Sequence, residues 1–173
     1  MKNLNIRLIS IIGLILLVSL SRLIPHLPNF TPVTALALFA GSYIRDKKFA
    51  FTVPLLAMFI SDIFIGFHPL IWAVYLSLLI GVLLGKLLET RKNIFKIFGV
   101  TLVSSIVFFI ITNFAHWLMY YDPSWQTLTK CYFDAIPFYR NSLLGDFIFV
   151  SVMFGSFALA EKYVPVLTTE RIK

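Results

Sequence analysis

The chain is organised as six long runs of apolar residues separated by short polar segments. A helix needs roughly 20 mostly apolar residues to cross the hydrocarbon core of a bilayer. On that basis we predict transmembrane helices over residues 6–24, 32–44, 49–65, 69–88, 94–119 and 142–163. The second run is short, so its helix must tilt, lean on its neighbours or lie partly inside a protein cavity. The pattern predicts one all-α transmembrane domain over residues 1–173.

The segment 120–141 separates the last two apolar runs and has its own pattern. It opens with Asp122-Pro123, which is typical of a helix start. Apolar and aromatic side chains then recur on one helical face: Trp125, Leu128, Tyr132 and Ile136. We predict an amphipathic helix that lies on the outer surface of the membrane and covers a pocket, either as fixed packing or as a moving lid.

Composition agrees with a membrane protein. Hydrophobic residues make up 59% of the chain and charged residues 13%, against roughly 25% charged residues in a soluble domain. The net charge of +7 comes from short basic clusters between apolar runs, a distribution typical of membrane topology. We therefore expect the lipid bilayer as a partner and no nucleic acid. The single cysteine, Cys131, excludes an internal disulfide.

The basic clusters also predict an orientation. If the N-terminus is cytoplasmic, twelve of the fifteen lysines and arginines fall on the cytoplasmic side, and only Arg22, Lys130 and Arg140 fall outside. This distribution follows the positive-inside rule and predicts that both chain ends are cytoplasmic. The first apolar run also resembles a signal peptide with a cleavage site near Ser19 and Ser21. Cleavage there would leave the downstream orientation unchanged.

Side chains suited to specific recognition gather at the predicted outer ends of the helices. The candidate substrate-binding residues are Arg22, His26, Asn29, Asp62, His68, Asn113, His116, Trp117, Tyr132, Asn141 and Asp146. An interfacial aromatic belt is the alternative explanation for the tryptophans and tyrosines. The cytoplasmic side carries mainly lysines and arginines, so we expect the site on the outer side.

Two carboxylates lie inside apolar runs, where a charge is costly and usually has a partner or faces a cavity. For Asp62, either Arg22 or a helix N-terminus is a possible partner. A structural ion pair and a role in the site are both open for Asp62 and for Asp146. On the fifth run, Asn113, His116 and Trp117 share one helical face by their spacing, which suits a cavity wall.

Three predicted helix starts face outward and favour an electronegative or anionic ligand group, because free N–H groups and positive dipole ends point there. They are Thr31-Pro32, His68-Pro69 and Asn141. Motifs for ATP hydrolysis, zinc proteolysis and serine hydrolysis are absent from the sequence. We therefore expect no enzyme and no cofactor. For a metal, His68, His116 and Cys131 are weak candidates.

Several strings carry a resemblance to a known family: residues 22–32, 61–68, 112–117, 131–138 and 141–146. On these the chain resembles an uncharacterised bacterial family of small membrane proteins assigned to transport. It is also similar, in size and six-helix layout, to the substrate-binding (S) components of energy-coupling-factor (ECF) vitamin importers. The resemblance implies an S-component-like fold and a multi-pass protein of the bacterial inner membrane.

The resemblance also implies a function: an outward-facing pocket captures a vitamin or related micronutrient for import. Delivery involves an ECF-type coupling subunit and two ATPases, or no dedicated module, as proposed for a solitary vitamin B12 carrier. If the ligand is a corrinoid, His68, His116 or Cys131 could approach its metal.

Two other functions stay open. A non-catalytic scaffold or assembly subunit would have no ligand-sized cavity and a partner on an apolar lateral face. A membrane enzyme that uses histidine and aspartate would need a His–Asp pair within hydrogen-bond reach, or a metal held by several outer groups.

Overall fold

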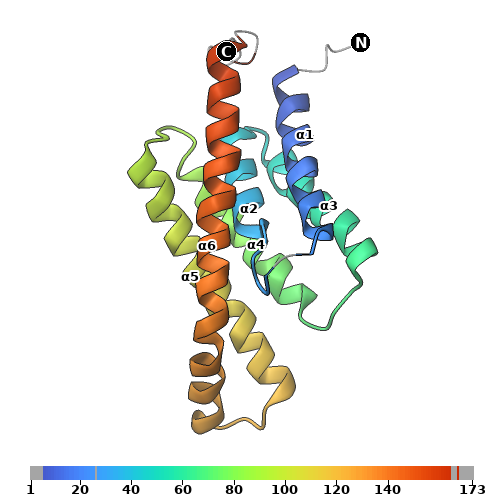
Figure 1. Cartoon of the computed structure of the whole chain (residues 1–173), viewed down its shortest axis with the longest axis vertical. Helices are drawn as coiled ribbons and strands as arrows, with labels where there is room; N and C mark the ends of the chain where they lie inside the picture. The colour runs from blue at the N-terminus through green and yellow to red at the C-terminus, as the bar shows by residue number, and fades with distance from the viewer. Residues whose placement is uncertain (1–5, 26, 165–166, 168–173) are drawn as a thin grey trace.

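The computed structural model describes residues 6–25, 27–164 and 167 (Figure 1). In this part of the chain there are α-helices and one 3-10 turn, and no strand. The elements are α1 (Ile6–Leu20), η1 (Ser21–Leu23), α2 (Val33–Tyr43), α3 (Lys47–Ile65), α4 (Ile71–Lys86), α5 (Ile94–Tyr120) and α6 (Trp125–Tyr163). The prediction of an all-α fold with six helices is confirmed.

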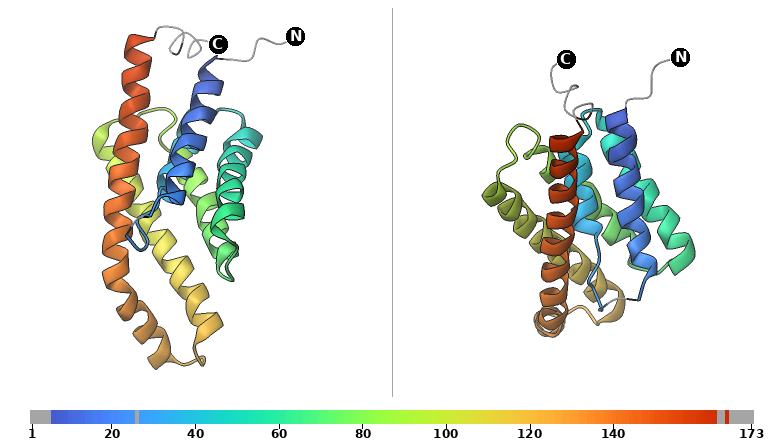
Figure 2. Two further views of the ribbon diagram at one scale, coloured as in Figure 1. Left: turned by 45° about the vertical axis from the view of Figure 1, so that its right-hand side comes forward. Right: turned by 45° about the horizontal axis from the view of Figure 1, so that its top comes forward.

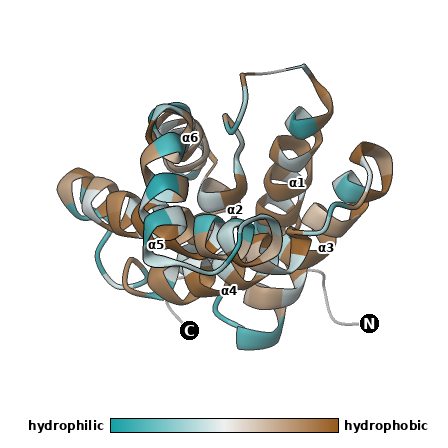
Figure 3. Ribbon diagram, turned by 90° about the horizontal axis from the view of Figure 1, so that it is seen from below, coloured by the Kyte–Doolittle hydropathy of each residue, from teal (hydrophilic) through white to brown (hydrophobic). Residues whose placement is uncertain are grey.

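Four segments of the described chain are long and apolar enough to cross a membrane: Ile6–Leu23, α3, α5 and α6. Large apolar side chains cover much of the outer surface, and brown hydrophobic ribbon dominates the helices seen from the end opposite the chain termini (Figure 3). The chain is therefore a multi-pass membrane protein. The helices α2 and α4, with 11 and 16 residues, are shorter than a full crossing.

The short helix α2 occupies the centre of the bundle. Every one of its residues, Val33–Tyr43, is buried, and it contacts α1, α3, α4, α5 and α6. At 1.5 Å per residue it is only about 16 Å long, about half the thickness of the hydrocarbon core. A helix with protein on all sides does not need to match the bilayer, so its length is free to be set by its neighbours.

Small residues let α2 and α4 approach closely. A Cβ on Gly41 would overlap the carbonyl oxygen of Val82, and a Cβ on Gly85 would lie 2.5 Å from the carbonyl oxygen of Leu38. A Cβ on Gly81 would likewise meet the Cβ of Ala37 at 2.8 Å. Backbones in membrane bundles approach in this way where small residues face each other. The α2–α4 contact is thus the tightest packing that the glycines record.

The sequence predicts two separate helices in residues 120–141 and 142–163, and this prediction is wrong: the structure has one continuous helix, α6. A capping box formed by Ser124 and Thr127 starts it. Pro137 lies inside the helix on an exposed face, so its missing N–H and the freed carbonyl are not enclosed by protein. The helix bends around such a position rather than ending.

The amphipathic pattern of residues 120–141 is also placed differently from expectation. Trp125 and Ile136 on the predicted apolar face are 75% and 54% exposed. In a membrane protein an apolar face can turn toward lipid, so apolarity does not identify the side that packs on protein. The packed side of this segment carries Thr127, Cys131 and Ala135, together with Tyr132 from the predicted face.

The start of α1 and the end of α6 lie at one end of the molecule, together with the connections 44–46 and 87–93 (Figures 1 and 2). We call this end the basic end. Its described charges are nine basic residues (Arg7, Arg45, Lys47, Lys48, Lys86, Arg91, Lys92, Lys96 and Lys162) and three acidic ones (Asp46, Glu89 and Glu161). The rest of the described chain holds three basic and four acidic residues.

Candidate functional site

A cavity of about 640 Å³ lies away from the basic end, between α4, α5 and the first half of α6. We call it the α5–α6 cavity. Its volume is within the range of roughly 300–1,000 Å³ that is usual for small-molecule sites. Its lining residues are Arg22, Pro28, Asn29, Thr31, Val33, His68, Leu70, Val74, Phe108, Phe109, Thr112, Asn113, His116, Tyr121, Cys131, Asp134, Ala135, Phe138, Tyr139 and Ser142.

The cavity exists because the helices around α2 differ in length. At 1.5 Å per residue α5 is about 40 Å long and α6 about 58 Å, against about 16 Å for α2. Both helices continue well past the start of α2, and their connection projects beyond the other helices (Figures 1 and 2). Val33, the first residue of α2, lines the cavity. The space beyond the Val33 end of α2 is therefore lined by side chains of the neighbouring elements.

The structure brings five of the sequence-predicted site residues to this cavity. They are Arg22, Asn29, His68, Asn113 and His116. They come from η1, the connections 24–32 and 66–70, and α5, so only the tertiary fold joins them. His26, another candidate, lies outside the described residues. The other five candidates do not line the cavity, and their contacts show what each one does.

Asp62 is 2% exposed and forms a buried ion pair with Arg22, with 2.7 Å between its carboxylate oxygen and the arginine Nη1. Its second oxygen accepts a hydrogen bond of 2.8 Å from the Tyr75 hydroxyl. The same Nη1 of Arg22 donates to the Ser61 hydroxyl. Buried charges are tolerated only when they are paired and hydrogen-bonded in this way. Asp62 thus holds Arg22 at the cavity wall and does not itself face the cavity.

Two buried donors on the cavity wall have no partner within the described protein. The Nε of Arg22 and the hydroxyl of Tyr139 are both enclosed and make no hydrogen bond, and both residues line the cavity. A buried donor without a partner costs about 1–3 kcal/mol. Such a cost at a concave site is reduced when a ligand presents an oxygen or nitrogen acceptor. Arg22 and Tyr139 are therefore the lining residues that keep a buried polar atom without a partner in the described part of the chain.

Asn113, His116 and Trp117 share one face of α5 as predicted, but they serve different purposes. The amide nitrogen of Asn113 donates to the carbonyl of Phe109 in its own helix, at 2.8 Å. The His116 ring packs against Tyr120, with 4.8 Å between ring centroids. Trp117 donates from Nε1 to the Thr127 hydroxyl at 3.0 Å and so ties α5 to the start of α6. Trp117 belongs to the hairpin, whereas Asn113 and His116 line the cavity.

The candidates on α6 also make structural contacts. The Tyr132 hydroxyl donates to the carbonyl of Ile110 at 2.7 Å. Asp146 is 5% exposed and lies near Thr34 of α2 and Ser105 of α5. Asn141 lies within α6 and is half-buried. The neighbouring Ser142 lines the cavity instead and donates to the carbonyl of Asn29 at 3.1 Å.

Two of the three predicted helix starts border the cavity. The helix α2 begins after Pro32 and α4 begins after Leu70, each without a side-chain cap, and Val33 and Leu70 line the cavity. The third start is wrong, because Asn141 lies inside the continuous α6 and caps nothing. Two positive dipole ends rather than three therefore adjoin the cavity.

The three metal candidates, His68, His116 and Cys131, all line the α5–α6 cavity. Within the described ranges, however, no group of three or more His, Cys, Asp or Glu side chains is placed to hold a metal ion. Cys131 is buried, and its Sγ lies 3.6 Å from the carbonyl oxygen of Asn113. The thiol therefore contributes to the packing of α6 on α5.

Tyr75 and Tyr139 are not among the candidate substrate-binding residues named from the sequence. Tyr75 lies in an apolar run, where a buried tyrosine needs a hydrogen-bond partner for its hydroxyl. In the structure that partner is the buried carboxylate of Asp62, so the position of Tyr75 in the run was the available signal. Tyr139 lies in a segment with several aromatic residues, and nothing in the spacing separates it from Tyr132. Only the structure shows that one hydroxyl is bonded and the other is not.

Comparison with known proteins gives one match. A family model described as a family of unknown function, DUF6580, matches residues 2–167. No curated protein matches the chain, and no solved structure does. Since the match covers nearly the whole sequence, the chain belongs to the DUF6580 family, whose function is unknown.

Proposed function

We propose that this protein is a membrane-embedded component that binds a small molecule, of the kind found in micronutrient importers, and that the α5–α6 cavity is its binding site. The observation that carries the proposal is a ligand-sized cavity whose wall holds two buried donors without partners, Arg22 Nε and the Tyr139 hydroxyl. A ligand that supplies a partner to such a group removes the cost of leaving it unsatisfied.

The lining indicates the chemistry of the ligand. Phe108, Phe109 and Phe138 provide apolar wall, which suits a ring or chain that leaves water. The arginine and tyrosine donors suit a carboxylate or another oxygen acceptor. A vitamin-like molecule with an apolar body and one acidic or carbonyl group complements both the phenylalanine wall and the arginine and tyrosine donors.

In this proposal the basic end faces the cytoplasm and the α5–α6 cavity faces outward. The support is the concentration of lysines and arginines at one end of the described chain. Cysteines placed singly at exposed Asp122 and Arg91, in a Cys131→Ala background, test it with a membrane-impermeant maleimide on intact cells. The position 122 cysteine should react and the position 91 cysteine should not; the reverse labelling would contradict the orientation.

The direct test of the function is to find the ligand. The protein is purified gently in mild detergent, and small molecules released by denaturation are identified by mass spectrometry. We expect one compound at near-stoichiometric amount that raises the unfolding temperature when added back. A protein that is reproducibly empty and not stabilised by vitamin-like acids would overturn the proposal.

The same preparation tests the partners. An importer of the ECF type should bring a coupling subunit and ATPases through purification, whereas a solitary carrier should bring a ligand alone. An empty protein that always arrives with another membrane subunit would instead favour a scaffold. The enzyme alternative requires a His–Asp pair, and no hydrogen bond joins a histidine to an aspartate among the described side chains.

A further inference from the structure

A second cavity, of about 790 Å³, lies at the basic end. It adjoins the other end of the central helix, where Ser42, Tyr43 and Ile44 contribute to its wall. We call it the basic cavity. It shares no lining residue with the α5–α6 cavity. The small-molecule site proposed for the α5–α6 cavity gives the basic cavity no role.

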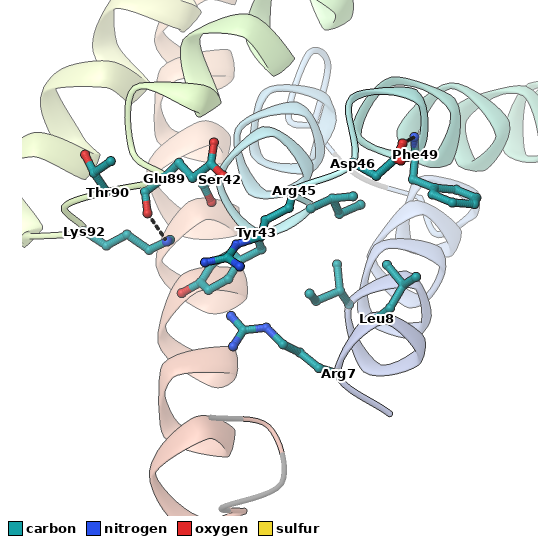
Figure 4. Close-up of a pocket in the computed structure, with 12 residues that line it drawn as sticks. Arg7, Leu8, Ser42, Tyr43, Arg45, Asp46, Phe49, Glu89, Thr90 and Lys92 are labelled. Carbon is teal, nitrogen blue, oxygen red and sulfur yellow. Dashed lines mark hydrogen bonds between the residues drawn. The ribbon is translucent and has the colours of Figure 1, made fainter. Parts of the chain in front are cut away.

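Three cationic side chains from different elements line this cavity: Arg7 from α1, Arg45 after α2, and Lys92 before α5. Figure 4 shows Arg7 and Arg45 extending toward the Tyr43 ring. The Nζ of Lys92 lies 4.5 Å and the Cζ of Arg7 lies 6.0 Å from the centroid of that ring. Cations over an aromatic face are held in a defined place. Three cations are therefore gathered around one buried tyrosine, and the charge of Arg7 is balanced by an ion pair of 2.8 Å with Glu161.

The two acidic residues of the lining have contacts of their own, and the carbonyl oxygen of Glu89 also accepts from the Nζ of Lys92 at 3.2 Å. The Asp46 carboxylate caps α3 by accepting from the backbone N–H of Phe49 at 3.1 Å. The Glu89 carboxylate lies 3.7 Å from the Nζ of Lys86. Around them the described part of the basic end carries nine cations against three carboxylates. The described part of this end is consequently positively charged, which favours an anion.

Apolar side chains form a further part of the lining. Leu8, Ile11, Ile44 and Phe49 form that wall, and Phe49 at the start of α3 is 50% exposed. On a membrane protein such a side chain faces lipid. The cavity thus joins a positively charged floor to a hydrocarbon-facing rim, at the level where a helix leaves the bilayer. A soluble anion uses only the first of these features, whereas a phospholipid uses both.

We propose that the basic cavity binds a phosphate group, and that its apolar rim selects the phosphate of an anionic phospholipid. Basic pockets between membrane helices on the cytoplasmic side are suited to such headgroups. In this arrangement Arg45 and Lys92 contact the phosphate, and the acyl chains pass over Phe49 toward the lipid.

The test uses the full chain in nanodiscs of phosphatidylglycerol or phosphatidylcholine, with native mass spectrometry of the lipids that stay bound after release into detergent. The variant is Arg45→Gln with Lys92→Gln. Its matched control is Lys47→Gln with Lys48→Gln, which removes the same charge from exposed positions of the same end that do not line the cavity.

We expect the wild type and the control to retain phosphatidylglycerol over phosphatidylcholine. Each cation near an anionic lipid contributes roughly fivefold in affinity, so the cavity variant should lose roughly 30-fold. The charge-conserving variant, Arg45→Lys with Lys92→Arg, should retain the lipid and thereby separate lost binding from lost folding. Equal losses in the cavity variant and the control would overturn the proposal, because bulk surface charge would then explain the retention.

A separate arm identifies the source of the phosphate. Inorganic phosphate is titrated into delipidated protein while the unfolding temperature is followed. Stabilisation by phosphatidylglycerol but not by millimolar phosphate supports the lipid. Stabilisation by phosphate alone, without selective lipid retention, supports a phosphate site and overturns the assignment to a phospholipid.

Discussion

The two ends of the central helix share a geometric origin and differ in chemistry. At the Val33 end the neighbouring helices run past α2 and leave a cavity of about 640 Å³; at the Tyr43 end they leave one of about 790 Å³. The first has one arginine held by a buried aspartate, with phenylalanines around it. The second has three cations around a tyrosine.

The difference shows how one short helix can provide two kinds of site. An 11-residue helix enclosed by longer ones leaves space at both of its ends, whatever the side chains. The chemistry then depends on which residues the neighbouring elements place there. A single positioned arginine in a mainly uncharged wall, to which Asp134 also contributes, suits selection by shape and hydrogen bonding. A cluster of cations instead suits attraction of charge.

The largest effect should come from the ion pair behind the α5–α6 cavity. Replacing Asp62 by alanine leaves the Arg22 charge buried without a partner, and breaking a buried pair in this way costs about 3–5 kcal/mol. Unfolding in detergent, followed by circular dichroism, measures this loss. The control is Asp134→Ala, which breaks an exposed pair with Lys130 and should change stability far less. Similar losses in both variants would contradict the structural role of Asp62.

A smaller loss is expected where α2 packs between the cavities. Leucine at Gly41 would collide with the backbone of α4 at Val82, and overpacking of this kind costs about 2–3 kcal/mol. Leucine at Gly155 is the control, because nothing lies within 4 Å of a Cβ built there. Thermal unfolding of the two variants gives the comparison. If Gly41→Leu is as stable as Gly155→Leu, then α2 and α4 are not in contact as the structure has them.

The smallest expected change in stability distinguishes two tyrosines whose rings both contact Phe109. Tyr132→Phe removes a hydroxyl that donates to Ile110 and should destabilise the ligand-free protein by about 1 kcal/mol. Tyr139→Phe removes a hydroxyl without a partner and should leave the ligand-free protein unchanged or slightly more stable. Calorimetric unfolding of delipidated, ligand-free protein measures both.

In the presence of the retained compound the order should reverse. Tyr139→Phe should lower the amount of compound that co-purifies, and Tyr132→Phe should keep it near the wild-type amount. If both variants retain the compound equally, then Tyr139 does not face the ligand and the α5–α6 cavity is not where the compound binds.

Helix positions were predictable because the hydropathy of each apolar run shows that the segment is surrounded by lipid or by protein interior. The predicted runs 49–65 and 94–119 correspond closely to α3 (Lys47–Ile65) and α5 (Ile94–Tyr120). The predicted helix start at Asn141 is wrong, because Asn141 lies inside the continuous α6, which packs against α5. A residue typical of a helix end marks a real end only when no neighbouring helix stabilises a longer helix by packing against it.

The candidate site was predictable in part. Arg22, Asn113 and His116 were found because polar groups at one end of apolar runs are few. The partner of Asp62 was among the alternatives that the sequence allowed, and the structure identifies it as Arg22. Spacing along the chain does not report which side of a helix faces a hollow, so Trp117 and Tyr132 look like site residues until their hydroxyl and carbonyl partners are seen.

What the sequence by itself determined is the class of the molecule: helices that need lipid around them, and a chain whose basic residues gather at one end. These follow from local hydropathy and charge, which each residue carries regardless of its neighbours. Only the tertiary structure decided that α2 is enclosed, that Asp62 supports Arg22, and that hollows lie at both ends of one short helix. Those features depend on the lengths of helices that are distant in sequence and on how far each one is shifted along the bundle axis. No single segment of the sequence encodes that relation.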